Sequence, residues 1–185
     1  LEALVGGALL LRVGFRPAID RVRDVFSLIV FGALLSTAIA ATNGVTTLWV
    51  SGEISGSDYG SRWLLWWIGD GMGALIVAPL IFVFSTRPWR HFDLRDRLEG
   101  VVVLAALVAL SATVFLAGQW RYPHLLFPVL IWATLRFQQP GAVTSSFVVA
   151  AFAVTGAVRG TALLGQGSTT EIVQILEGLI AGVAV

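Results

Sequence analysis

The sequence predicts an all-α fold, a polytopic transmembrane helical bundle with about seven apolar segments, of which the first and last are incomplete. The first observation is composition, because 57% of the 185 residues are hydrophobic and only 12% are charged; the mean hydropathy is +0.86. The second is pattern, since the apolar residues form continuous blocks, whereas a transmembrane β-barrel needs short stretches of alternating polarity. The third is that the basic residues, all arginine, cluster in the loops. We therefore expect one integral membrane domain over residues 1–185.

The apolar segments follow one another with polar loops between them. They are expected at residues 1–11, 25–50, 63–85, 98–118, 123–137, 143–158 and 172–185. The fifth is short: at about 1.5 Å per residue it reaches roughly 22 Å, less than a hydrocarbon core of about 30 Å. The fifth and sixth segments therefore form either two short spans or a re-entrant hairpin, and both alternatives return the chain to the same side. The first and last segments look cut, which indicates a fragment of a longer protein.

The third segment carries the most unusual residue, an acid inside an apolar helix. Trp63, Trp66 and Trp67 crowd its start, as expected where indole rings sit at a membrane surface. Asp70 follows Trp63 by seven residues, which places it about 10 Å below that surface. An ionised aspartate at a helix centre costs about 2.5–3.5 kcal/mol on insertion scales, so such a residue usually has a partner or faces trapped water.

Two interpretations of Asp70 stay open. It is a ligand or proton switch, together with Trp66 and Trp67 and with Asn43, Arg159, Glu2 or His124 as partners from neighbouring segments. Alternatively, it is a buried acid that packs helices and is paired or neutral.

Three further residues of this segment are expected to serve helix packing. Gly69 and Gly73 are four residues apart on one face, where small residues let another helix approach closely. Pro79 follows at a place where a kink is tolerated if neighbours satisfy the freed carbonyl.

The arginines predict the orientation. If the loops at residues 12–24 and 86–99 face the cytoplasm, alternation also places Arg136 inside, giving nine arginines inside and three outside. This orientation places Asp70 toward the extracytoplasmic side. It also points the last segment toward the cytoplasm.

Several kinds of chemistry find no support. The sequence has no cysteine, which excludes disulfides and cysteine metal sites. The two histidines, His91 and His124, lie on opposite sides in this topology, which argues against a histidine metal site. No nucleophile elbow, zinc-protease motif or phosphate-binding glycine loop is present. We expect no catalytic residues, no metal, no cofactor and no nucleic-acid partner.

Three blocks resemble a known family. WLLWWIGDGMGALIVAPL, the opening LEALVGGALLLR, and LLFPVLIWATLRF followed by a Gly-Ala-rich span and Arg159-Gly160 are similar to the membrane-associated sensor domain of the first type, the MASE family. The resemblance implies an input module of the bacterial inner (plasma) membrane, placed before cytoplasmic cyclase, phosphodiesterase, PAS or histidine kinase domains. Gln138-Gln139-Pro140 departs from the pattern, since a glycine-containing turn is expected there.

We therefore expect a sensory input module of a bacterial signalling protein, of the diguanylate cyclase or histidine kinase type. Its expected partners are the lipid bilayer, a cytoplasmic signalling domain in the same full-length chain, and a second copy or another membrane protein. The alternative is a solute-binding or transport module in which Asp70 lies in the substrate path.

Overall fold

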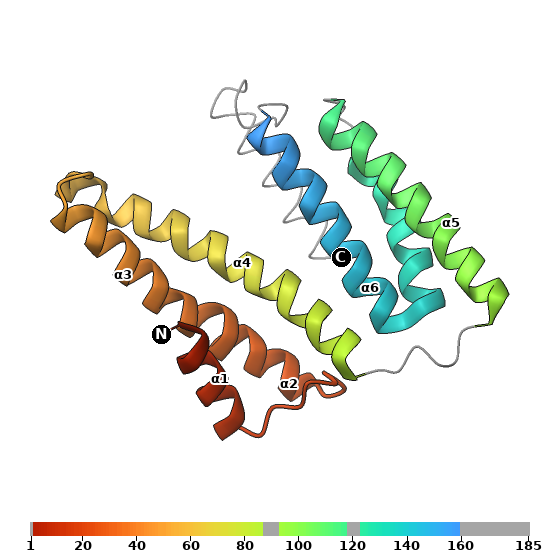
Figure 1. Ribbon diagram of the computed structural model, residues 1–185, viewed down its shortest axis with the longest axis horizontal. Coiled ribbons are helices and arrows are strands. Elements are labelled where there is room, and N and C mark those ends of the chain that lie inside the picture. The colour runs from red at the N-terminus through yellow and green to blue at the C-terminus, as the bar shows by residue number, and fades with distance from the viewer. Residues whose placement is uncertain (1, 87–92, 118–122, 160–185) are drawn as a thin grey trace. The chain divides into compact units, whose positions relative to one another are not determined.

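The structure is a computed structural model that describes residues 2–86, 93–117 and 123–159. The chain divides into two compact units, Leu1–His91 and Phe92–Val185. Every regular element among the described residues is a helix (Figure 1). The all-α prediction is therefore confirmed.

The first unit is a long helical hairpin with a short helix beside it. Its elements are α1 (Glu2–Arg12), α2 (Val22–Ser27), the π-helical segment η1 (Leu28–Leu35), α3 (Ser36–Val50), the short 3-10 turn η2 (Gly56–Asp58) and α4 (Tyr59–Thr86). α2, η1 and α3 form one continuous helix that α4 follows back along its length (Figure 1). α1 packs against η1 and α3.

Small residues allow the helices of this hairpin to approach closely. Ala33 and Ala41 are buried on the long helix. On α4, a Cβ added to the buried Gly71 would lie 3.1 Å from the carbonyl oxygen of Ala33. Close backbone approach at small residues is how helices associate in lipid, where no hydrophobic effect drives them together.

The second unit is built on α5 (Leu94–Ser111), which continues as the π-helical segment η3 (Ala112–Leu116). After the short turn η4 (Pro123–Leu125), α6 (Leu126–Val158) folds back on itself at Gln138, whose φ of 54° and ψ of −133° are not helical (Figure 1). A Cβ added to Gly141 would lie 2.1 Å from the carbonyl oxygen of Ala133. In a straight helix these two residues would be about 12 Å apart along the axis, so the two parts of α6 are antiparallel arms.

The arms are held by one apolar core. Leu107, Val114 and Phe115 from α5 and η3 are buried with Leu126 of the first arm, and Phe152 of the second arm packs against this cluster. Each arm is too short to build a core alone. The shared core makes the reversal at Gln138 part of the fold, and the expected return of the chain to the same membrane side stays a prediction.

The described residues show fewer apolar segments long enough to span a membrane than the seven expected for the whole chain. Within the described residues, four stretches are long and apolar enough to cross a membrane: Val22–Val50, Gly56–Thr86, Leu94–Leu116 and Pro123–Val158. The last of them is the folded-back pair of arms, so its length does not measure one straight crossing. α1, with 11 residues, lies in the first expected segment. The final expected segment, residues 172–185, lies outside the described residues, and the structure does not show seven segments.

The outer surface of the helices is apolar. Leu65, Met72 and Ile81 on α4 are 72%, 59% and 58% exposed. A water-soluble protein rarely displays a continuous apolar surface of this kind, whereas lipid chains cover it at no cost.

Candidate functional site

Asp70 lies well inside α4. It follows Tyr59, the first residue of the helix, by eleven residues and precedes Thr86, the last, by sixteen, which places its Cα about 16 Å from one end and 24 Å from the other. Its side chain is half-buried. Trp66, one turn earlier on the same helix, donates its Nε1–H to Asp70 Oδ2 at 2.9 Å. An indole donor therefore satisfies part of a carboxylate that lipid would leave without hydrogen bonds.

A glycine on the facing helix positions that indole. A Cβ added to Gly44 of α3 would lie 2.6 Å from Cη2 of Trp66 and 2.8 Å from Cζ2. Any side chain at this position would push the ring away and with it the donor to Asp70. The lack of a side chain at Gly44 therefore sets the position of Trp66.

The two neighbouring indoles join α4 to the long helix. Trp63 donates its Nε1–H to Thr42 Oγ1 at 2.9 Å, and Trp67 donates its own to the carbonyl oxygen of Leu34 at 2.8 Å. Their rings stack with centroids 5.4 Å apart. Each indole N–H thus has a separate acceptor, so these tryptophans act as more than surface anchors.

Asp70 also lies beside the junction between η1 and α3. The hydroxyls of Ser36 and Thr37, the first residues of α3, donate to the carbonyl oxygens of Gly32 and Ala33 in η1. Gly71, the residue after Asp70, approaches Ala33 at the same place. π-helical turns are rare and occur often at functional sites. The contacts of Trp67 and Gly71 on α4 therefore converge on the end of η1, at Leu34 and Ala33.

A second carboxylate reaches this region from α1. Glu2 lies within electrostatic range of Asp70, where two negative charges repel each other. Within the described part of this unit, no arginine forms an ion pair with Glu2 or Asp70. A charged carboxylate inside an apolar helix is costly to insert, so such a group usually has a partner or faces trapped water.

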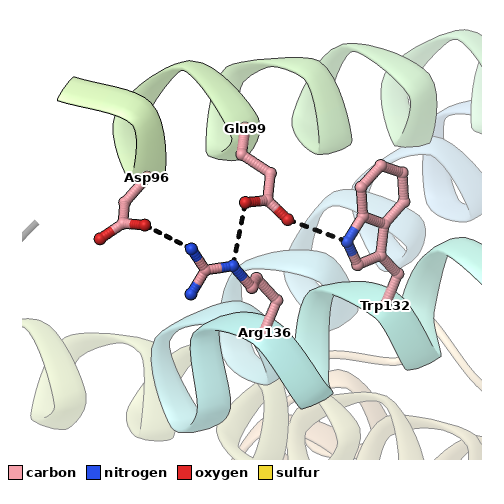
Figure 2. Close-up of polar contacts among 4 residues, drawn as sticks. All are labelled: Asp96, Glu99, Trp132 and Arg136. Atoms are coloured by element: carbon pink, nitrogen blue, oxygen red, sulfur yellow. Dashed lines mark hydrogen bonds and ion pairs between the residues drawn. The ribbon is translucent and has the colours of Figure 1, made fainter. Parts of the chain in front are cut away.

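The second unit carries a separate polar cluster between the start of α5 and the first arm of α6 (Figure 2). Arg136 donates through Nε to Glu99 Oε2 at 2.9 Å and through Nη2 to Asp96 Oδ1. Trp132 donates its Nε1–H to the other oxygen of Glu99 at 3.1 Å. All three charged side chains are partly exposed. The cluster fastens the first arm of α6 to the start of α5 where water can reach it.

A model of the MASE1 family matches residues 1–185, the whole of the sequence. The chain belongs to the MASE1 family. MASE1 is a membrane-associated sensory domain of signalling proteins. No curated protein and no solved structure matches the chain significantly.

In this MASE1 domain the structure brings some of the expected site residues together and leaves others apart. Trp66 donates a hydrogen bond to Asp70, whereas Trp67 binds the Leu34 carbonyl instead. Asn43 is exposed on α3, and its carbonyl oxygen accepts a hydrogen bond from Thr47. Arg159 is exposed at the end of α6 in the other unit. The roles expected for Asn43 and Arg159 stay predictions.

The residues expected to pack helices differ in their surroundings. A Cβ added to Gly69 or Gly73 would meet no described atom within 4 Å, whereas Gly71 between them makes the close contact with Ala33. Pro79 lies inside α4, which continues as one helix to Thr86. The packing role of Gly69 and Gly73 therefore stays a prediction, and it would need a neighbour other than the described part of this unit.

Sequence reasoning missed several residues of this MASE1 domain. The Arg136 cluster has a local signal, because Asp96 and Glu99 are three residues apart and Trp132 and Arg136 are four apart, so each pair shares one helix face. What the spacing does not show is that the two helix faces meet.

No group of three or more potential metal ligands occurs among the described residues of the chain.

Proposed function

We propose that this MASE1 domain is the sensory input module of a bacterial inner-membrane signalling protein, with a diguanylate cyclase or histidine kinase as its cytoplasmic output, and that Asp70 is its switch. The observation that supports Asp70 is its setting: a half-buried carboxylate deep in α4 that accepts a hydrogen bond from Trp66. The family favours sensory input over solute transport.

The mechanism is a shift between two populations of the helix bundle. A stimulus changes such an equilibrium only through a difference in affinity for the two states. Neutralising Asp70, by a proton or by a ligand that binds it, removes the repulsion from Glu2 and weakens the Trp66 hydrogen bond, because a neutral carboxyl group is a poorer acceptor. Both changes act on the position of α4 relative to α1 and α3.

The contacts that follow on α4 carry the change onward. Trp67 and Gly71 both contact η1, through the carbonyl oxygens of Leu34 and Ala33. A movement of α4 by a fraction of a turn would break these contacts and favour a different register in η1. In the proposed mechanism, the altered hairpin biases the last segment of the domain and through it the cytoplasmic output.

The test uses the full-length protein with a diguanylate cyclase as its cytoplasmic reporter. The cyclic dinucleotide that the cells produce is measured. Asp70→Asn and Asp70→Ala are compared with the parent at equal membrane levels. We expect both to hold output high or low regardless of the stimulus. Trp66→Phe should shift output in the same direction, while Trp63→Phe, which removes an indole donor to Thr42 rather than to Asp70, is the matched control. Unchanged output in both Asp70 variants would contradict the switch.

A further inference from the structure

The turn between α1 and α2 exposes a group of arginines. We call residues 12–24 the arginine turn. Its four basic residues are all exposed: Arg12, Arg16, Arg21 and Arg23. The exposed acid among them is Asp20. Four guanidinium groups therefore face water or headgroups with one exposed carboxylate among them.

Several contacts fix the conformation of the arginine turn. Asp24 is fully buried, and its Oδ1 accepts a hydrogen bond from the backbone N–H of Arg16 at 3.2 Å. The guanidinium of Arg23 reaches back to the carbonyl oxygen of Gly14 at 3.3 Å. A ring contact between Phe15 and Phe82, with centroids 5.3 Å apart, ties the turn to α4. These contacts position the arginines before any ligand arrives, which lowers the entropy cost of binding.

Asp24 is buried, whereas the arginines of the turn are exposed. Asp24 Oδ2 has no hydrogen-bond partner among the described residues and no exposure, so this acid is not on the exposed face of the turn. Arg16 and Arg21 have side chains that make no hydrogen bond or ion pair within the described part of the chain. Their guanidinium groups are available to an anion outside the protein.

Apolar side chains surround the same turn. Leu11, Val22 and Phe26 are 80%, 74% and 62% exposed. Exposed apolar groups beside guanidinium groups match the boundary between lipid headgroups and acyl chains. A binding site for a soluble anion would not need them.

We propose that the arginine turn binds the phosphate groups of anionic phospholipids in the adjoining leaflet, with Leu11, Val22 and Phe26 against the acyl chains. Guanidinium groups bind phosphate oxygens with two parallel hydrogen bonds, which ammonium groups cannot do. This inference is independent of the switch proposed for Asp70.

The experiment measures lipid selectivity of the full-length protein in nanodiscs of phosphatidylcholine with a minor fraction of phosphatidylglycerol. The lipids that remain bound are counted by native mass spectrometry. The test variant is Arg16→Gln/Arg21→Gln, which leaves the contacts of Asp24 and Arg23 intact. Its matched control is Arg62→Gln/Arg159→Gln, which removes the same charge from exposed arginines elsewhere.

We expect the parent and the control to retain phosphatidylglycerol selectively. The test variant should lose about fivefold in affinity for each arginine removed, since a basic residue near an anionic surface contributes about 1 kcal/mol. Arg16→Lys/Arg21→Lys should recover part of the loss, because charge remains but paired hydrogen bonds do not. Tryptophan fluorescence verifies that each variant is folded.

Three results would overturn the proposal. The test variant could keep the selectivity of the parent, or the control could lose as much as the test variant, which would make total charge the cause. Inorganic phosphate could also displace phosphatidylglycerol completely and bind equally well in pure phosphatidylcholine discs, which would assign the turn to a soluble anion.

Discussion

Replacing Gly141 with alanine should separate the two arms of α6. The added Cβ would lie 2.1 Å from the carbonyl oxygen of Ala133 and 2.9 Å from Cβ of Phe137, whereas ordinary contacts are 3.4–4 Å. The nearest atom belongs to the backbone, so no side-chain rotation relieves the overlap. The arms must move apart by about an ångström or more, and gaps of 0.5–1 Å already forfeit a quarter to a half of the dispersion energy between the atoms they separate.

The expected loss is about 3 kcal/mol in the free energy of unfolding. Overpacking a core usually costs about 1–3 kcal/mol, and the backbone contact puts this substitution at the upper end. Gly73→Ala is the matched control, because a Cβ there would meet no described atom within 4 Å. Its expected effect has the opposite sign, a gain of up to about 1 kcal/mol from helix propensity.

Both variants can be unfolded by SDS in mixed micelles and followed by tryptophan fluorescence, to which Trp132 on the first arm contributes. Comparison with the parent gives the difference in free energy. If Gly141→Ala proves as stable as Gly73→Ala, the arms do not approach at Gly141. The antiparallel arrangement of α6 would then be wrong.

Four other changes have distinct expected outcomes in the same unfolding assay. Gln138→Gly should raise the free energy of unfolding by about 1 kcal/mol. A positive φ costs a non-glycine residue about 1–3 kcal/mol, while glycine loses about 0.5–1 kcal/mol more backbone entropy on folding. A lower free energy of unfolding would show that Gln138 is unstrained. Asp24→Ala should cost about 1–3 kcal/mol because it leaves a backbone N–H unsatisfied, and Asp24→Asn, which keeps the acceptor, should cost less; equal losses would contradict this. Trp67→Phe removes the donor to Leu34 and should cost about 1 kcal/mol, so an unchanged stability would show that the bond adds nothing. Arg136→Gln should lower stability at low salt and less at high salt, because ions screen exposed pairs; a loss independent of salt would assign Arg136 a packing role.

Much of the fold follows from local sequence. Blocks of apolar residues identify the helices at 25–50, 63–85 and 98–118 because burial in lipid depends on the composition of each stretch rather than on distant contacts. The short segment after Pro123 already indicates a reversal. Gln138 stands in a conformation that glycine adopts most easily, which is the position where the family resemblance led us to expect a glycine-containing turn.

The candidate site could be located from sequence but not assembled. Asp70 is conspicuous as a lone acid in an apolar segment, and Trp66 lies one turn away on the same face. That Trp66 rests against Gly44, and that Glu2 approaches from α1, depends on how three helices pack. No local pattern carries that information.

The sequence by itself determined the class of this protein, the places of its long helices, the acid at position 70 and the family resemblance, all of which depend on the identity and order of neighbouring residues. The tertiary structure decided which faces meet. It selected Gly71 over Gly69 and Gly73 as the contact with the long helix, and it joined Arg136 to α5. The physical reason is rotation: successive residues on a helix point about 100° apart, so spacing shows which residues share a face, while the packing of neighbouring side chains decides which face turns inward.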